Sequence, residues 1–151
     1  MKPELFFGLV GAVGTDLYKV SAVLEHLLTD FGYVSTQVRL SAVLDEIFPD
    51  LPKQPEELRI EKHMDAGDDL RTKTQLGGSL AIMGISHVRA KRISERDKPE
   101  EPLDAHAFIF NSLKHPKEIE ILRRIYGESF VLIGCLLSEA KTLRQSSKAS
   151  C

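Results

Sequence analysis

Three glycines near the beginning of the chain have the spacing of a phosphate-binding turn. A short apolar run over residues 5–10 leads through Gly8, Gly11 and Gly14 into an amphipathic stretch. This order predicts a buried strand, a tight turn and the N-terminus of a helix. Such a turn presents backbone N–H groups at the positive end of a helix dipole, which suits a phosphate. The residues expected to contact a phosphate or nucleotide there are Gly11, Val13, Gly14, Thr15 and Asp16.

The turn departs from the phosphate-loop pattern G-x-x-x-x-G-K-[ST] at its most important positions. In that pattern the lysine reaches the β- and γ-phosphates and the hydroxyl binds Mg²⁺. Aligned on Gly14, the chain has Leu9 at the first glycine, Thr15 at the lysine and Asp16 at the hydroxyl. The sequence therefore predicts a phosphate cradle without a standard phosphoryl-transfer site. The simpler alternative is that the glycines only permit a tight strand-to-helix turn.

Two residues of the turn have alternative interpretations. Thr15 either caps the following helix or contacts a phosphate through its hydroxyl. Asp16 repels an anion, so it either holds Mg²⁺ or caps the helix, where the dipole favours a negative charge. We favour capping for Asp16.

Further cations could serve a phosphate site. Arg39 follows the second expected strand, and a surface role is an equal alternative. Arg89 and Arg92 belong to a basic cluster with Lys91 and Arg96. The cluster could close as a lid over phosphates and stabilise transition-state charge, but a solvated helix face is the more common meaning of such a run. Asn111 ends the third expected strand, where an amide cannot supply the charge of a magnesium-orienting carboxylate.

The remaining pattern predicts the elements that position these residues. Apolar runs predict strands over 4–10, 33–38, 107–110 and 130–137, and helical periodicity predicts helices over 16–31, 41–48, 55–74, 79–95, 115–126 and 138–145. We expect Ser41 to cap the second helix. Strands alternating with helices indicate an α/β fold with a mainly parallel sheet between two helical layers. The glycine turn, Arg39–Ser41 and Asn111–Ser112 should then meet at the carboxyl ends of the strands, where such sheets bind ligands.

Composition limits the classes of function. The chain has 151 residues and a net charge of −2, which provides no global attraction to nucleic acid or to an anionic membrane. No apolar run approaches the roughly 20 residues that span a bilayer. The spacing of the two cysteines, Cys135 and Cys151, is typical of neither a disulfide framework nor a zinc motif, so we expect a cytoplasmic protein without zinc.

Four segments occur in an order that resembles a known family. They are the glycine turn, Met64–Arg71, Phe108–Glu118 and Leu122–Gly134. Together, over residues 4–140, they resemble P-loop nucleotide kinases of the deoxynucleoside-monophosphate-kinase and dephospho-coenzyme A kinase type. Within that type, they resemble the kinase-like N-terminal domain of bacterial anti-phage dCTP deaminases.

The resemblance carries its own expectations. It implies a P-loop NTPase-like, Rossmann-like fold and a nucleotide ligand, ATP or a dNTP, accompanied by Mg²⁺. Arg71 would contact the phosphate of the acceptor, although a solvated arginine paired with Asp68 is an equal alternative.

The chain also departs from that family. The deaminase half of such proteins needs an H-x-E motif and a P-C-x-x-C pair, and neither occurs here, so this chain should not deaminate. Such kinases normally have a fifth strand, which we expect to be missing. The expected organisation is a degenerate P-loop domain over 1–145 and a disordered tail over 146–151, from a gene that continues into a deaminase or lost it.

Three functions remain open at this point. The leading hypothesis is a nucleotide- or phosphate-binding domain that regulates or assembles an attached or separate deaminase. The alternatives are an active deoxynucleoside monophosphate kinase with a non-standard loop, and an oligomerisation module that covers an unpaired sheet edge in a homo-oligomer. RNA is a conceivable partner, but the sequence contains no RNA-binding signature.

Overall fold

The computed structural model describes residues 1–12, 14–74 and 78–136, except for the side chains of residues 71, 73 and 74. In chain order the elements are β1 (Leu5–Gly11), α1 (Leu17–Asp30), β2 (Val34–Arg39), α2 (Leu40–Ile47), α3 (Glu56–Thr74), α4 (Ser79–Arg96), β3 (His106–Asn111), α5 (Pro116–Tyr126), the 3₁₀ turn η1 (Gly127–Ser129) and β4 (Phe130–Cys135). These elements confirm the strands and helices expected up to residue 136. The helix expected over 138–145, the tail and any further strand lie outside the described residues.

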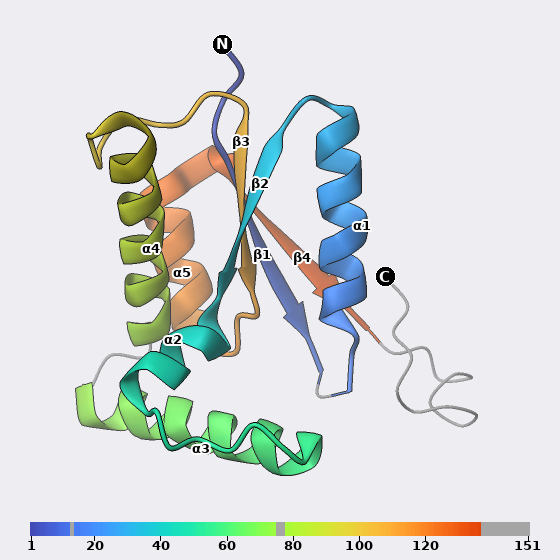
Figure 1. Ribbon diagram of the computed structural model, residues 1–151, viewed down its shortest axis with the longest axis vertical. Helices are drawn as coiled ribbons and strands as arrows, with labels where there is room; N and C mark the ends of the chain where they lie inside the picture. Colours follow the sequence, from blue (N-terminus) through green and yellow to red (C-terminus); the bar gives the residue numbers. More distant parts are fainter. Residues whose placement is uncertain (13, 75–77, 137–151) are drawn as a thin grey trace.

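The strands form one parallel sheet in the order β2-β3-β1-β4 (Figure 1). The register pairs Asn111 of β3 with Leu9 of β1 on one side and with Arg39 of β2 on the other. The last residue of β3 therefore lies between the ends of two neighbouring strands.

Helices cover both faces of the sheet, which confirms the three-layer, Rossmann-like α/β/α architecture. On one face, Leu17 and Leu28 of α1 pack with Leu9 and Ile109 of the sheet. On the other, α4 and α5 cover a larger core that includes Phe6, Phe108 and Phe110. The strands alternate between these two cores because successive side chains of a strand point to opposite faces.

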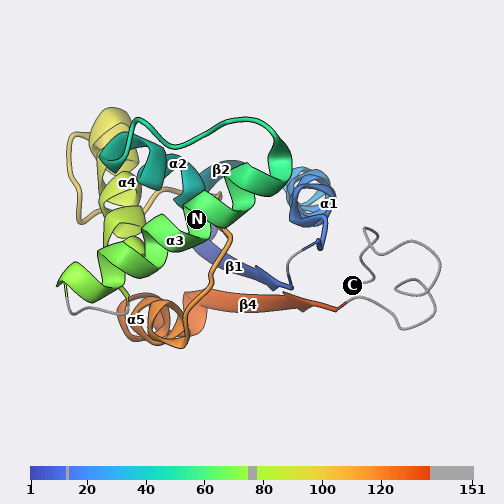
Figure 2. The same cartoon turned by 90° about the horizontal axis from the view of Figure 1, so that it is seen from below.

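This topology opens a crevice at the carboxyl ends of β1 and β3. The two strands are neighbours, but the chain leaves β1 into α1 on one face and leaves β3 into α5 on the other. Parallel sheets bind ligands at such a switch point. Seen from below, α3 crosses this edge of the sheet, with α2 beside it (Figure 2).

The start of α2 corrects one expectation. Ser41 is not the N-cap, because β2 passes directly into α2 and the N-cap is Arg39, in extended conformation and without a side-chain capping bond. Ser41 instead lies within the first turn.

Within the described residues, no helix combines the length and apolar character needed to cross a membrane.

Candidate functional site

A cleft of about 550 Å³ lies at the carboxyl edge of the sheet. This volume is in the range of sites for small molecules. Its walls come from the glycine turn and the start of α1, from α2, from α3, from the start of α4 and from the loop that follows β3. The lining residues used below are Thr15, Asp16, Tyr18, Ser41, Arg59, His63, Asn111, Ser112, Lys114 and His115.

The glycine turn is tighter than an open phosphate cradle. The Thr15 N–H donates to the Ala12 carbonyl at 3.0 Å, and Gly14 has a φ of 92°, a conformation that favours glycine. A Cβ on Gly11 would lie 3.0 Å from the Cβ of Thr15, so the strand and the turn are closely packed. The N–H of Thr15 is therefore used within the turn, and the turn offers a ligand less of its backbone than the sequence pattern suggested.

Asp16 caps α1. Its carboxylate accepts a hydrogen bond from the N–H of Lys19 at 3.1 Å, which confirms the capping interpretation. The same side chain lines the cleft, so a carboxylate and the positive end of α1 reach the cleft together.

Two buried polar atoms at the cleft have no hydrogen-bond partner among the described residues. They are the hydroxyl oxygen Oγ1 of Thr15 and the amide nitrogen Nδ2 of Asn111. Because buried polar groups in proteins are almost always paired, two unpaired atoms on adjoining walls of one cleft indicate that a ligand or ordered water completes them.

The loop after β3 is fixed by one long-range contact and one local contact. The N–H of Leu113 donates to the Leu9 carbonyl of β1 at 2.8 Å. The N–H of Lys114 donates to the Glu118 carboxylate at 3.1 Å, and Glu118 is 0% exposed. These contacts hold Lys114 beside the end of β1. Although its side chain is accessible from the cleft, surrounding protein removes enough water from the ammonium group to lower the pKa of Lys114, and Glu118 opposes that shift.

The α3 wall supplies two basic side chains that already have partners. Arg59 donates two hydrogen bonds to Glu56, at 2.8 and 2.6 Å, and this pairing raises the pKa of Arg59 despite partial burial. His63 contacts the Arg59 carbonyl through Nδ1 at 2.7 Å and the Asp45 carboxylate through Nε2 at 2.9 Å. Both ring nitrogens of His63 are therefore engaged within the protein, one by α3 and the other by α2.

Asp45 connects α2 to α3 and to the intervening segment, because Lys53 also contacts it at 2.8 Å. Burial raises the pKa of Asp45, but the hydrogen bonds from Lys53 and His63 outweigh burial and bring the pKa below its ordinary value.

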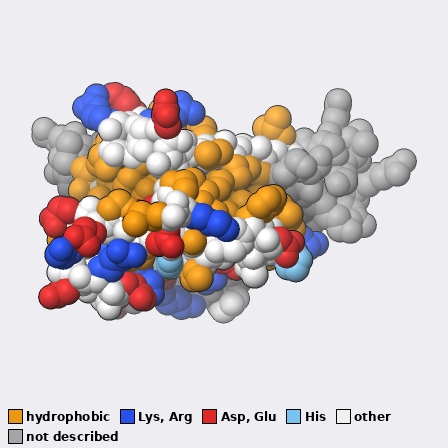
Figure 3. Space-filling model, turned by 90° about the horizontal axis from the view of Figure 1, so that it is seen from above, with side chains coloured by type: hydrophobic (Ala, Val, Ile, Leu, Met, Phe, Trp, Pro, Cys, Tyr) orange, Lys and Arg blue, Asp and Glu red, His pale blue; other side chains and the backbone are white. Residues whose placement is uncertain are grey.

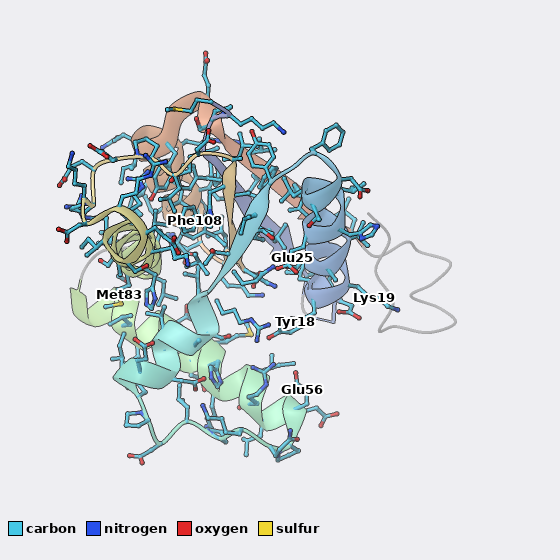
Figure 4. The ribbon with its side chains drawn as sticks, turned by 45° about the horizontal axis from the view of Figure 1, so that its top comes forward. Tyr18, Lys19, Glu25, Glu56, Met83 and Phe108 are labelled. Carbon is cyan, nitrogen blue, oxygen red and sulfur yellow. The ribbon has the colours of Figure 1, made fainter. Side chains whose placement is uncertain are left out.

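Tyr18 and Glu56 lie on opposite sides of the cleft, at the starts of α1 and α3 (Figure 4). The guanidinium group of Arg39 lies over the Tyr18 ring, 5.3 Å from its centroid. Arg39 is therefore at the predicted edge of the sheet. It contacts Tyr18, which lines the cleft, but Arg39 itself does not line the cleft.

The structure does not bring Arg89 and Arg92 to the cleft. Arg92 forms an ion pair with Glu4, which precedes β1, and Arg89 pairs with Glu100 at 3.1 Å. Both pairs lie at the amino ends of the strands, opposite the glycine turn. Figure 3 looks down on this end, where basic and acidic side chains are intermixed around a hydrophobic centre. The arginines therefore cannot act as a lid over the glycine turn in this arrangement.

Two expected site residues are not fully described. Val13 and the side chain of Arg71 lie outside the described residues, so their contacts with a phosphate stay predictions.

Sequence reasoning missed Lys114, Arg59 and His63 as cleft residues. A signal for Lys114 was present, since it follows β3 directly and the loops after parallel strands meet at the ligand-binding edge. Arg59 and His63 gave no comparable signal, because their position depends on how α3 crosses that edge.

A second surface feature is an apolar stripe on the outer side of α1. Val23, Leu27 and Phe31 follow one another at four-residue spacing and are exposed, as is Val34 on the edge strand β2. Nothing among the described residues shows what covers this stripe, so the expected homo-oligomer stays a prediction.

Comparison with models of known protein families, and with curated proteins, finds no match for the chain.

Proposed function

We propose that this protein binds a phosphorylated small molecule of the nucleotide class in the cleft at the carboxyl edge of its sheet. The observation that carries the proposal is the pair of buried, unpartnered atoms, Thr15 Oγ1 and Asn111 Nδ2, on adjoining walls. A hydroxyl and an amide can both donate to phosphate oxygens. Lys114, from the loop after β3, lines the same cleft and adds a positive charge to it.

The opposite part of the cleft suits a flat, largely apolar group. Its apolar lining is made by Leu40, Leu44, Ile60, Met64 and Leu80. Tyr18 lies at the same cleft, and an aromatic ring can stack on a nucleobase. A ligand with a charged end and a planar ring therefore matches both parts of the cleft.

The expected Mg²⁺ fits only as a companion of the ligand. In nucleotide sites Mg²⁺ takes one or two carboxylates and completes its shell with phosphates and water. The glycine turn offers the Asp16 carboxylate, which also caps α1. No group of three or more metal-binding side chains occurs in the described part of the chain.

Binding is better supported than rapid phosphoryl transfer. The turn has no lysine, Asn111 replaces a carboxylate, and Arg89 and Arg92 are paired at the far end of the sheet. We propose a regulatory binding domain, with kinase activity as the alternative that ADP formation dependent on a deoxynucleoside monophosphate would reveal. Association with a deaminase or with RNA stays a prediction from the family resemblance alone.

Calorimetric titration with ATP, GTP, dCTP, dCMP and dTMP, each with and without Mg²⁺, tests the proposal. We expect one of these nucleotides to bind the wild-type protein. Thr15→Val should weaken the affinity for that nucleotide about tenfold or more, because it removes a hydrogen bond to a charged group. Thr29→Val is the matched control, because the Thr29 hydroxyl bonds a carbonyl within α1, at 2.9 Å. Failure of the folded wild-type protein to bind any of the five would contradict the proposal.

A further inference from the structure

The basic side chains that line the cleft differ in whether they are free to bind an anion. Arg59 is held by two hydrogen bonds from its guanidinium group to Glu56. His63 is held by Asp45. The Nδ1 atom of His115 accepts a hydrogen bond from the N–H of Lys117 at 3.1 Å. Each of these three side chains therefore already has a partner within the protein.

Lys114 is different. Among the described residues, no carboxylate lies within ion-pair distance of its ammonium group, and no side-chain hydrogen bond holds that group. Its position, in contrast, is well fixed. The N–H of the preceding residue, Leu113, is bonded to β1, and the N–H of Lys114 itself is bonded to the buried Glu118. The result is a free charge on a rigid support.

The free charge also lies where the unpartnered atoms lie. Lys114 follows Asn111 by three residues, and β3 is the direct neighbour of β1, which leads into Thr15. Asn111, Thr15 and Lys114 all line the same cleft. An anion that accepts hydrogen bonds from Thr15 and Asn111 would therefore share this cleft with Lys114, a cation that no described carboxylate holds.

We infer that Lys114 is the anion-binding cation of this site and provides, from the loop after β3, the charge that the glycine turn lacks. The inference rests on the proposed function and specifies its chemistry, because the ligand end bound at the turn is a phosphate or a chain of phosphates. Glu118 is a positioning residue, since it holds the Lys114 backbone and does not reach the ligand.

This assignment has a pH signature. The titratable groups that line the cleft with Lys114 are Asp16 from the turn, Tyr18 from α1, Glu56, Arg59, His63 and Asp68 from α3 and His115 from its own loop, and Glu118 from α5 holds its backbone. Only the protonated lysine attracts a phosphate. Because loss of hydration lowers the pKa of Lys114, affinity should fall as pH rises through that lowered value. Arginine stays protonated over the same range, so Lys114→Arg should remove the pH dependence and keep the affinity.

Titration with inorganic tripolyphosphate, and with dCTP, at several alkaline pH values tests the inference. We expect Lys114→Ala to weaken tripolyphosphate binding about tenfold or more and Lys114→Arg to stay within about threefold of wild type. Lys117→Ala is the matched control, since Lys117 is exposed and pairs with Glu120 on α5 at 3.0 Å.

A second measurement does not depend on any variant. Acetylation of lysines by an N-hydroxysuccinimide ester, mapped by mass spectrometry, should modify Lys114 readily, and tripolyphosphate should protect it while Lys117 stays reactive. If wild type binds but Lys114→Ala binds equally well and Lys114 is not protected, the inference is wrong and the proposed function stands. If wild type binds neither tripolyphosphate nor any nucleotide, both are wrong.

Discussion

Gly14 is the residue at which backbone conformation and ligand binding are most directly linked. Its φ of 92° is unfavourable for any residue with a Cβ, so Gly14→Ala should lower the free energy of unfolding by about 1–2 kcal/mol. The substitution should also weaken binding of the ligand identified by titration, because the turn that carries Thr15 must shift. Urea denaturation and calorimetry measure the two effects.

Gly127→Ala is the control for that substitution. Gly127 also has a positive φ, of 57°, and no atom lies within 4 Å of a Cβ built there. The control should lose stability without losing affinity. Equal loss of affinity in both variants would show that the effect at Gly14 is only general destabilisation.

The environment of Asp45 predicts how the stability of the protein changes at acidic pH. Its pKa in the folded protein is below the ordinary 3.8, because Lys53 and His63 donate to the carboxylate. The unfolded chain therefore binds the proton more readily, and the stabilisation from Asp45 is present above about pH 3.8 and lost as pH falls through the folded pKa. Urea denaturation of Asp45→Asn between pH 2 and 6 should show a shallower fall in stability than wild type.

Asp50→Asn controls for a general effect of removing an acid. Asp50 is exposed in the segment after α2, and no ion pair joins it to another described residue. Its variant should follow the wild-type curve. If Asp45→Asn did so too, the hydrogen bonds between α2 and α3 would not contribute to stability.

At the scale of elements, β1 packs tightly against the loop after β3 that lines the site. A Cβ on Gly8 would lie 2.6 Å from Leu113 and 2.8 Å from Phe130, both of which are buried. Gly8→Ala should therefore cost about 1–3 kcal/mol of stability through overpacking, and it should weaken ligand binding because Leu113 precedes Lys114. Thermal denaturation and titration of the variant measure both.

Gly134 on the neighbouring strand β4 provides the comparison. Nothing lies within 4 Å of a Cβ at this position, so Gly134→Ala should leave stability and affinity close to wild type. A stable Gly8→Ala protein with unchanged affinity would mean that the loop after β3 is insulated from β1.

The elements themselves were largely predictable because their signals are local. Leu17, Leu24 and Leu28 repeat at helical spacing, and the apolar run in β1 can be read directly from the sequence. The expectation that Ser41 caps α2 was wrong, because the capping preference of serine does not indicate whether a strand continues directly into a helix. The partners of Arg92 and His63 could not be predicted, since each bond joins segments whose approach is set by packing.

At the scale of the whole molecule, the carboxyl end of the sheet carries the proposed ligand site, and the amino end carries a buried ion pair that we expect to stabilise the fold. The ion pair between Arg92 and Glu4 is buried, with side chains 12% and 3% exposed, and Glu4 also accepts from the N–H of Leu103 at 2.6 Å. Arg92→Ala should cost about 3–5 kcal/mol, because it leaves a buried carboxylate without its cation. Affinity at the cleft should not change, and urea denaturation with titration checks both.

Arg89→Ala is the control, since its pair with Glu100 is exposed and should contribute at most about 1 kcal/mol. A loss of ligand affinity in Arg92→Ala under conditions where the variant is folded would restore a role for this basic cluster at the ligand.

The walls of the cleft come from stretches widely separated in the chain, at residues 12 and 14–18, 40–44, 56–68, 80 and 111–115. No part of the chain can assemble this cleft alone, so the unfolded protein has no corresponding site. A ligand present at a hundred times its Kd should then stabilise the native state by about 2.7 kcal/mol through mass action. Amide hydrogens across the whole sheet, including those far from the cleft, should exchange more slowly in its presence, so that one small molecule reports on the cooperativity of the entire domain.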